Sequence, residues 1–521
     1  MGADKDKGAT SEWCWVRHSE IAVINPKKPE LNEDAVVSFV PMAAVPEEVG
    51  TAELEEERTF SQVKKGYTSF QDGDILFAKI TPCMENGKVA LVEGLRSGFG
   101  FGSTEFHVSR LHPDLCKEFY LHFFMSHQFR AGAQRNMSGS AGQLRVPKHY
   151  FADVELPLPP LNEQRRIVAK IEVLFSQLDK GVESLKTARA QLKTYGQSLL
   201  KAAFEGRLTE QWRRDNADKL ETADQLLQRI REEREVRYQQ QVEEWKTDVA
   251  KWESYGRLGK RPKKPATAFY FHDEESSNRD NLSELPSSWR WVEIGDLFSV
   301  YVGATPSRKE PLYWGGAINW VSSGEVAFCQ IRDTKEKITS EGLENTSTTI
   351  HPEGTVILAM IGEGKTRGQA AILRVRAAHN QNTAAIRVPE AGLESAYIYY
   401  YFMYRYEETR MVGSGNNQKA LNKSRVQRML LPLAPENEQT TISRIIEQGL
   451  SAISHVEANL DDQIQKAETL RQSILKRAFE GQLVSQDPDD EPASALLERI
   501  RQEQADAPKP KRRKRKAEVS A

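Results

Sequence analysis

The chain has 521 residues, of which 39% are apolar and 28% charged, and its formal net charge is −2 at pH 7. This length exceeds what a single hydrophobic core supports, so we expect several parts. The chain contains no apolar run near 18 residues, and its N-terminus lacks the apolar centre of a signal peptide, so we predict a cytoplasmic protein. The four cysteines are widely spaced and the ten histidines form no i, i+4 pair, which argues against disulfide and metal sites. Because the charges nearly balance, any nucleic-acid surface must be local.

Residues 1–155 are predicted to form a first globular domain. Residues 73–92 form a strand, a polar loop and a second strand. Another polar loop, residues 138–145, precedes a long helix. Loops carried on a rigid sheet are common places for recognition residues. In such loops, Asn and Gln can pair with adenine, and Arg and Lys can pair with guanine or phosphate. The candidate nucleic-acid contacts of this domain are Asn86, Lys88, Ser138, Ser140, Gln143 and Arg145.

Residues 156–256 are predicted to be mainly helical. Three prolines between residues 157 and 160 end the preceding strand, and Asn162 is the predicted N-cap. A heptad stripe follows, which favours packing against another helix as a coiled coil. Its a positions are Ile171, Leu178, Leu185, Leu192 and Leu199. At about 1.5 Å per residue, a helix from Asn162 to Phe204 would be roughly 65 Å long. Residues 219–256 are highly charged and are predicted to form a helical extension. Residues 257–284 are predicted to form a flexible linker.

Residues 285–430 are predicted to form a second globular domain. Residues 359–366 fit a relaxed phosphate-binding P-loop, but a P-loop requires a helix directly after its Lys-Thr pair, and residues 367–376 indicate a strand. We therefore favour a loop between two strands that would present Lys365 and Arg367 at the surface, as candidate nucleic-acid contacts. A second polar loop again precedes a helix, and its candidate contacts are Asn416, Asn417, Gln418 and Lys419.

Residues 431–505 are predicted to form a second helical region, and residues 506–521 are predicted to form a basic, disordered tail. The packing positions of the second stripe, at a or d, are Ile446, Ile453, Leu460, Leu470 and Ile474. In the tail, seven of the eight residues from 509 to 516 are Lys or Arg, so it could contact phosphate without sequence preference.

The chain is an internal duplication. A shift of 275 residues superimposes the Leu-Pro-Leu and Asn-Glu-Gln motifs that begin at Leu156 and Asn162 on those that begin at Leu431 and Asn437. The match continues without a gap to Ala-Phe-Glu-Gly, whereas the globular segments match weakly. Similar helices between divergent domains indicate a common scaffold with two different recognition surfaces. Two tandem copies related by a pseudo-two-fold axis would place their helices antiparallel.

This order of motifs resembles the specificity subunit of type I restriction-modification systems, over nearly the whole chain. Residues 303–307 (GATPS) and 320–325 (WVSSGE) are similar to the opening of that family's target recognition domains; the first domain lacks the Thr-Pro-Ser turn. The resemblance implies an α+β fold with two target recognition domains separated by two long antiparallel coiled-coil helices. The predicted boundaries are 1–155 and 285–430 for these domains, 156–256 and 431–505 for the helical spacers, 257–284 for the linker and 506–521 for the tail.

The resemblance also implies a function. Each domain would read half of a bipartite site in double-stranded DNA, and the helices would space the half-sites and dock two methyltransferase subunits, to which motor-nuclease restriction subunits attach. S-adenosylmethionine, ATP and magnesium would belong to those partners, so this chain is expected to be non-catalytic and to hold no cofactor. Further DNA-binding candidates lie in and beside the two family-like segments: Thr305, Ser307, Arg308, Ser322 and Ser323.

Two alternatives stay open at this point. A coiled-coil adaptor could bridge proteins without reading DNA. A nucleotide-dependent enzyme could use Lys365 in a P-loop.

Overall fold

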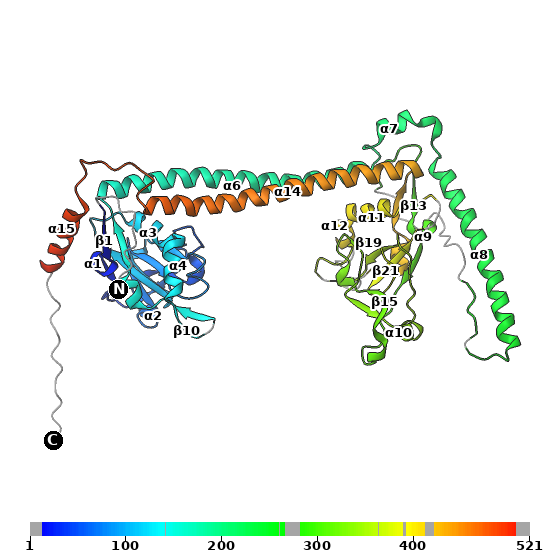
Figure 1. Cartoon of the computed structure of the whole chain (residues 1–521), viewed down its shortest axis with the longest axis horizontal. Coiled ribbons are helices and arrows are strands. Elements are labelled where there is room, and N and C mark those ends of the chain that lie inside the picture. Colours follow the sequence, from blue (N-terminus) through cyan, green and yellow to red (C-terminus); the bar gives the residue numbers. More distant parts are fainter. Residues whose placement is uncertain are drawn as a thin grey trace, which may run out of the picture. The chain divides into compact units, whose positions relative to one another are not determined.

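The computed structural model describes residues 13–140, 142–259, 261–265, 282–362, 364–388, 392–411 and 421–506. The basic tail beyond Asp506 and most of the predicted linker therefore lie outside the described residues. The chain divides into two compact units (Figure 1). Unit 1 comprises Met1–Thr187 and Leu460–Ala521, and unit 2 comprises Ala188–Asn459.

The globular domain of unit 1 contains two four-stranded sheets, with strand orders β2-β9-β6-β7 and β4-β3-β8-β5. Its strands are β1 Cys14–Arg17, β2 Ala22–Ile24, β3 Val36–Val40, β4 Glu57–Thr59, β5 Thr68–Gln71, β6 Ile75–Ala78, β7 Val89–Leu91, β8 Phe99–Gly102, β9 Phe106–Leu111, β10 Ser138–Ser140, β11 Gln143–Arg145 and β12 Glu155–Leu158. Its helices are α1 His18–Ile21, α2 Phe60–Val63, α3 Lys117–Met125, α4 His127–Arg135 and α5 Lys148–Asp153.

The globular domain of unit 2 has a five-stranded sheet, β14-β21-β18-β19-β16, and a three-stranded sheet, β17-β15-β20. Its strands are β13 Arg290–Glu293, β14 Ser299–Val302, β15 Trp314–Val321, β16 Cys329–Ile331, β17 Glu336–Ile338, β18 Val356–Ala359, β19 Ala370–Leu373, β20 Ala377–His379, β21 Thr383–Arg387 and β22 Leu430–Leu433. Its helices are α9 Ile294–Leu297, α10 Ser340–Glu344, α11 Ser395–Tyr404, α12 Tyr406–Met411 and α13 Lys423–Gln427.

The central strand of each domain is buried on both faces. Successive side chains of a strand point to opposite sides of the sheet. Ile75 and Phe77 of β6 accordingly join the aromatic core beneath α3 and α4, whereas Leu76 and Ala78 join a second cluster. Strand β18 divides its side chains between two clusters in the same way. Each of these strands pairs antiparallel with the next strand in the sequence, β7 or β19. Residues 73–92 thus form the strand, loop and second strand that the sequence predicts.

The repeat recurs in the strand pair that closes each domain. Strand β1 pairs antiparallel with β12, and Trp15 lies opposite Pro157. Strand β13 pairs in the same way with β22, and Trp291 lies opposite Pro432. Each closing strand leads directly into a long helix, so both copies use the same junction between domain and helix.

The two long helices are α6 Leu161–Phe204 and α14 Glu436–Phe479, with 44 residues each. In unit 1, Arg471 near the end of α14 pairs with Asp179 in the first half of α6. In unit 2, Gly449 near the start of α14 lies against Leu199 near the end of α6. The helices are thus antiparallel within each unit, as the resemblance implies. At about 1.5 Å per residue, each helix is about 66 Å long.

The start of each helix is locked by the Asn-Glu-Gln motif. Glu163 accepts a hydrogen bond from the indole of Trp13 (3.0 Å), and Glu438 accepts one from Trp289 (2.8 Å). Gln164 donates to the carbonyl of Pro159 (2.9 Å), and its counterpart in α14 donates to Ala434 (2.8 Å). Both helices begin before the asparagine, so the prediction of Asn162 as an N-cap is wrong, and Asn437 at the equivalent place is not an N-cap either. The glutamine and the glutamate of the motif make the junction contacts instead.

The heptad frame is half right. At the a positions, Ile171, Leu199, Ile446, Ile453 and Ile474 are buried, and Leu178, Leu185, Leu192 and Leu460 are partly buried. The predicted d row is only partly right: Leu470, Tyr195 and Val456 are 50%, 59% and 44% exposed. Two other d residues are in contact, since Leu174 packs against a domain core and Gly449 lies against Leu199. The second buried row falls one residue later, at e, with Phe175, Gly196, Ala203 and Ala478. Both a/d and a/e rows recur every seven residues, so periodicity alone cannot separate them.

Each globular domain is completed by helices from the other copy of the repeat. In unit 1, Phe479 at the end of α14 packs edge-on against Phe119 and Phe123, with ring centroids 5.3 and 5.0 Å away. In unit 2, Phe204 at the end of α6 packs in the same manner against Tyr397 and Tyr401. The Ala-Phe-Glu-Gly motif is therefore an aromatic anchor.

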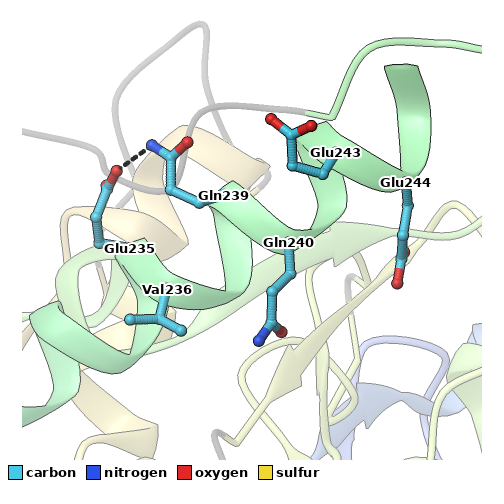
Figure 2. A pocket seen from close by; sticks show the side chains of 6 residues that line it. All are labelled: Glu235, Val236, Gln239, Gln240, Glu243 and Glu244. Carbon is cyan, nitrogen blue, oxygen red and sulfur yellow. Dashed lines mark hydrogen bonds between the residues drawn. The ribbon is translucent and has the colours of Figure 1, made fainter. Parts of the chain in front are cut away.

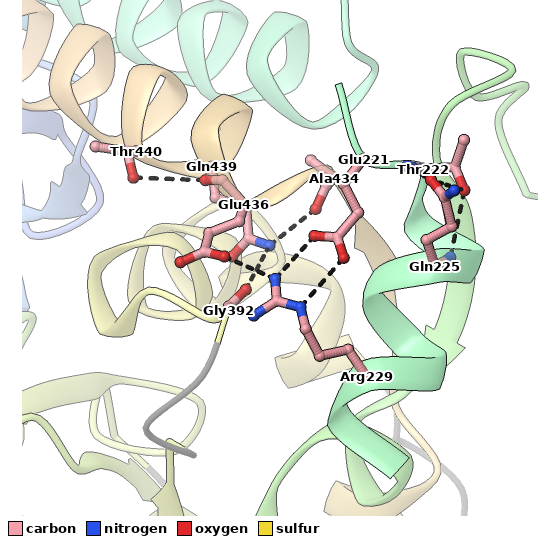
Figure 3. Close-up of polar contacts among 9 residues, drawn as sticks. All are labelled: Glu221, Thr222, Gln225, Arg229, Gly392, Ala434, Glu436, Gln439 and Thr440. Atoms are coloured by element: carbon pink, nitrogen blue, oxygen red, sulfur yellow. Dashed lines mark hydrogen bonds and ion pairs between the residues drawn. The ribbon is translucent and has the colours of Figure 1, made fainter. Parts of the chain in front are cut away.

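Shorter helices follow the two anchors and also contact the domain of the other copy. They are α7 Glu210–Asp215, α8 Ala223–Ser254 and α15 Ala493–Asp506. In unit 2, Arg229 of α8 pairs with Glu221 (2.8 Å) and with Glu436 at the start of α14 (2.8 Å), as Figure 3 shows. In unit 1, Arg499 of α15 pairs with Glu491 (2.8 Å) and with Asp114 (3.1 Å). The repeat thus extends through the ion pairs beyond the long helices.

Candidate nucleic-acid interface

In the first domain, the structure brings the two predicted recognition loops together. The backbone N–H of Thr81 donates to the carbonyl of Leu144 (3.0 Å), and that of Val146 donates to the carbonyl of Lys79 (2.8 Å). Residues 81–88 therefore lie beside the hairpin formed by β10 and β11. Two segments about 60 residues apart in the sequence form one polar surface.

The hairpin carries the most accessible candidates of this domain. Ser138, Ser140 and Gln143 are exposed, and Figure 1 shows β10 projecting from its domain. Gly139 has φ 137°, and a Cβ at this position would lie 2.7 Å from the carbonyl oxygen of Gln143. Glycine is therefore required for the two strands of the hairpin to approach each other.

Arg145, at the base of the hairpin, forms a bidentate ion pair with Glu105. Its Nε and one terminal nitrogen donate to the two carboxylate oxygens at 2.9 and 3.0 Å. The hydrogen bond from Arg145 is the largest cause that lowers the pKa of Glu105, and the pKa of Arg145 is raised in turn. Lys79 lies near this pair, and burial lowers its pKa. Both members of the pair therefore stay charged.

Asn86 and Lys88 are engaged within the domain. The side chain of Asn86 is exposed and donates to Glu47 (2.8 Å), while the ammonium of Lys88 is partly buried and donates to the carbonyl of Met42 (3.3 Å). Helix α4 supports the same turn, because Arg130 donates to the carbonyl of Glu85 (2.7 Å). The roles of Asn86 and Lys88 at DNA stay predictions.

In the second domain, the loop between β18 and β19 presents Lys365, which is exposed. Helix α12 supports this loop: Tyr406 donates to the carbonyl of Lys365 (2.5 Å), and Arg367 donates to the carbonyl of Arg410 (2.7 Å). The next element is the strand Ala370–Leu373, and Gly368 returns a hydrogen bond to Ala359 (2.9 Å). No helix begins after the Lys-Thr pair, so the P-loop reading is wrong.

Arg308 is the second candidate that is held by a glutamate. Its two terminal nitrogens donate to the carboxylate of Glu336, and its guanidinium lies over the ring of Trp314, 3.8 Å from the centroid. Nearby, the indole of Trp314 donates to the carbonyl of Ser307 (3.2 Å), and the hydroxyl of Thr305 donates to Gln381. The family-like turn is therefore joined to neighbouring strands by side-chain contacts.

The other candidates of this domain differ in their surroundings. The hydroxyl of Ser322 donates to Glu325 (2.9 Å) and helps to close the short turn that contains Ser323. Asn416, Asn417, Gln418 and Lys419 lie outside the described residues. Their roles, and that of Ser323, stay predictions.

The buried histidines belong to the domain cores. His18 lies within hydrogen-bond distance of the carbonyl of Phe151 (2.8 Å) and of the hydroxyl of Ser109 (2.7 Å). Burial lowers the pKa of His18 and of His107 to about 4. In the second domain, His351 and His379 are also buried, and their pKa values are lowered to about 4 and about 3. In the part of the chain that the structure describes, no group of three or more His, Cys, Asp or Glu side chains is placed to hold a metal ion.

A hollow of about 600 Å³ lies along α8 (Figure 2). Its described lining consists of six residues of this one helix: Glu235, Val236, Gln239, Gln240, Glu243 and Glu244. Gln239 donates to Glu235 across one helical turn (2.6 Å). These side chains form a polar helix surface with no converging set of cationic or nucleophilic groups, so it resembles neither a phosphate site nor a catalytic site. Among the described residues, no helix combines the length and apolarity that crossing a bilayer requires.

Sequence reasoning missed Glu105, Glu336 and Trp314. The two glutamates are 40 and 28 residues from the arginines that they hold, and acidic residues are ordinarily discounted at a DNA surface. No local pattern marks them. Each glutamate meets its arginine only through the tertiary fold: Glu105 lies just before β9 and Arg145 in β11, whereas Arg308 lies in the loop after β14 and Glu336 in β17.

Comparison with known proteins agrees with the geometry. Residues 10–193 and 286–466 match the family model described as "Type I restriction modification DNA specificity domain". The chain is 32% identical to the specificity subunit of the type I restriction enzyme EcoEI of Escherichia coli over 335 residues, which cover 58% of this chain and 54% of that protein. It is also 32% identical to the EcoAI specificity subunit of Escherichia coli over 333 residues, covering 56% and 52% of the two chains. The match spans about half the length of these relatives.

Solved structures share the fold. A chain from a structural study of complex assembly and conformational transition in a type I R-M system has a TM-score of 0.63 at 19% identity, over 91% of this chain and 99% of that one. The HsdS subunit of Thermoanaerobacter tengcongensis has a TM-score of 0.54 at 19% identity, over 91% and 97%. The family match covers both copies of the repeat and more than half of the sequence. The chain therefore belongs to the family of type I restriction modification DNA specificity domains.

Proposed function

We propose that this chain is the DNA specificity subunit of a type I restriction-modification complex, and that each globular domain reads one half of a bipartite site. The observation that carries the proposal is that the two copies of the repeat are more similar in their helices than in their globular domains. The Leu-Pro-Leu and Asn-Glu-Gln junctions recur in both copies and the long helices align without a gap, whereas the globular segments match weakly. Among the described residues the domains carry different exposed polar elements: a hairpin with Ser138, Ser140 and Gln143 in one, and an Arg308-bearing turn in the other. Two domains of different surface on one kind of scaffold suit a site with two different halves.

The long helices are proposed to space the half-sites and to dock two methyltransferase subunits. Three apolar side chains on these helices, Tyr195, Val456 and Leu470, are 59%, 44% and 50% exposed. Apolar surface that stays exposed can pack against another protein, and we propose that these side chains form part of the methyltransferase contact. Motor-nuclease subunits would join through the methyltransferases. S-adenosylmethionine, ATP and magnesium would be bound by those partners, and this chain would contribute recognition without catalysis.

The test is selection from a library of random duplexes by the full-length chain, purified with its methyltransferase partner. We expect enrichment of two short fixed sequences separated by a constant number of unspecified bases. Replacing residues 285–430 by the corresponding domain of another family member should change only one of the two sequences. Enrichment without any sequence preference would contradict the proposal and favour a scaffold that does not read DNA.

A further inference from the structure

Two candidate arginines, one in each domain, share an arrangement that the repeat does not explain. Arg145 lies in the hairpin β10–β11 and is held by Glu105; Arg308 follows β14 and is held by Glu336. In both cases the carboxylate binds two nitrogens of the guanidinium. The two arginines occupy different places in the sequence of elements, so the shared feature is a local arrangement in each domain.

The ion pairs leave hydrogen-bond donors unused. A guanidinium has five N–H donors. Arg145 uses two toward Glu105 and a third toward the carbonyl of Gln143 (3.1 Å), so two remain. Arg308 uses two toward Glu336, so three remain among the described contacts. The side chains of Arg145 and Arg308 are 40% and 54% exposed, so these donors are accessible.

The plane of each guanidinium is also fixed. A bidentate carboxylate sets the orientation of the group about its own axis. Arg308 is further held over Trp314, and the ring of Trp314 meets Trp320 edge-on at 5.1 Å. Arg145 belongs to a strand pair, in which it lies opposite Ser138. An arginine fixed in this way loses less side-chain entropy when it binds than a free one does.

The charge of each pair decides what it can bind. Each glutamate is ionised, since the hydrogen bonds from its arginine are the largest cause that lowers its pKa. Each pair is therefore nearly neutral as a unit, and a DNA phosphate that approached the arginine would also meet the carboxylate. Phosphate contacts are normally made by uncompensated Lys and Arg. The major-groove edge of guanine is uncharged and offers two acceptors, O6 and N7, which match two donors of a guanidinium.

We infer that Arg145 and Arg308 each read a guanine in the major groove, and that Glu105 and Glu336 are positioning residues that set the selectivity of these arginines. This inference rests on the proposed function, because it assigns residues within a site that reads DNA. It names the base that each domain recognises through its arginine. Glu105 and Glu336 act on DNA only through the arginines that they hold.

The experiment uses the full-length chain, purified with its partner, and the duplex selected from the library. Each guanine is replaced in turn by 7-deazaguanine, which lacks the N7 acceptor. We expect one position in each half-site to lose affinity about tenfold. Arg145→Met, which removes every hydrogen-bond donor of the side chain, should abolish that loss in one half-site and leave the other unchanged, and Arg308→Met should do the reverse. Glu105→Gln should reduce the preference for guanine over the other bases at the same position about tenfold, with the second half-site unchanged.

Glu56→Gln is the matched control, since Glu56 forms an exposed ion pair with Arg58 of the same domain (2.6 Å) and should leave base preference unchanged. Several results would overturn the inference. A loss that is equal for all sequences, with a weaker salt dependence, would assign the arginines to phosphates. A lower Tm of Glu105→Gln with unchanged base preference would make the pair purely structural. Fixed half-sites without a guanine sensitive to 7-deazaguanine would refute it with wild-type protein alone. A library without any fixed sequence would contradict the proposed function as well.

Discussion

At the scale of single residues, Glu438 joins three parts of unit 2. Its carboxylate is fully buried and accepts hydrogen bonds from Trp289 (2.8 Å), Thr209 (2.6 Å) and Arg213 (2.8 Å). Glu438→Gln leaves Arg213 without its counter-charge, and the loss of one partner of a buried ion pair costs about 3 kcal/mol. We expect the free energy of unfolding to fall by that amount in urea titrations. Glu468→Gln on the exposed face of the same helix is the control and should change it by less than about 0.5 kcal/mol.

The buried histidines predict how stability depends on pH. The pKa of His18 is lowered to about 4 from 6.5, so the folded state favours the neutral ring. This contribution is complete above pH 6.5 and is lost as the pH falls toward 4, because the unfolded chain takes up the proton first. From these two pKa values, His18 should cost about 2 kcal/mol of stability between pH 7 and pH 5. Urea titrations at both pH values measure the change. His18→Gln should reduce it, and an unchanged pH dependence would contradict the assignment.

The residues predicted for DNA contact were chosen by their chemical type. The structure separates them into accessible side chains and side chains that form hydrogen bonds within the domain. Ser138, Ser140, Gln143 and Lys365 are accessible, whereas Lys88 and Ser322 are engaged in internal hydrogen bonds. Type and loop position can be read from the chain. The pairing of Arg145 with Glu105 cannot, because it depends on a contact between segments 40 residues apart.

At the scale of elements, the seam of the long helices predicts unequal effects of neighbouring substitutions. Ile453, at a, is 9% exposed and contacts Gly196 of α6, whereas Val456, at d, is 44% exposed. Ile453→Ala should lower the free energy of unfolding by about 3 kcal/mol, and Val456→Ala by less than about 1 kcal/mol. Urea denaturation followed by helical circular dichroism gives both values. Equal losses would mean that the a/d seam, and not the a/e seam, packs the helices.

The a row could be predicted from the sequence because large aliphatic residues recur at seven-residue intervals. The second row could not. In α6 the d positions include Leu174 and Tyr195, and the e positions include Phe175 and Gly196, so both rows offer comparable apolar content. The packing of α14 determines which row of α6 is buried. Ile453 and Leu450 fill the space beside Gly196, which leaves Tyr195 outside the seam. The strands of the closing pairs were easier to predict, because the prolines and the repeated Leu-Pro-Leu motif mark them in both copies.

At the scale of the whole molecule, the exchange of helix ends predicts that the two halves of the chain depend on each other. Each domain core includes an aromatic anchor from the other copy, Phe479 in unit 1 and Phe204 in unit 2. A chain cut between residues 259 and 282 would therefore give two fragments that each lack part of a core. Co-expressed fragments 1–259 and 282–521 should co-purify in a 1:1 ratio, and each fragment expressed alone should expose apolar surface and aggregate. Tagged pull-down and size-exclusion chromatography measure this.

Phe479→Ala, which removes the contacts with Phe119 and Phe123, should weaken the association, whereas Leu470→Ala on the exposed face should leave it unchanged. Two monomeric, cooperatively folding fragments would contradict the exchange and would mean that each domain completes its core without the other copy.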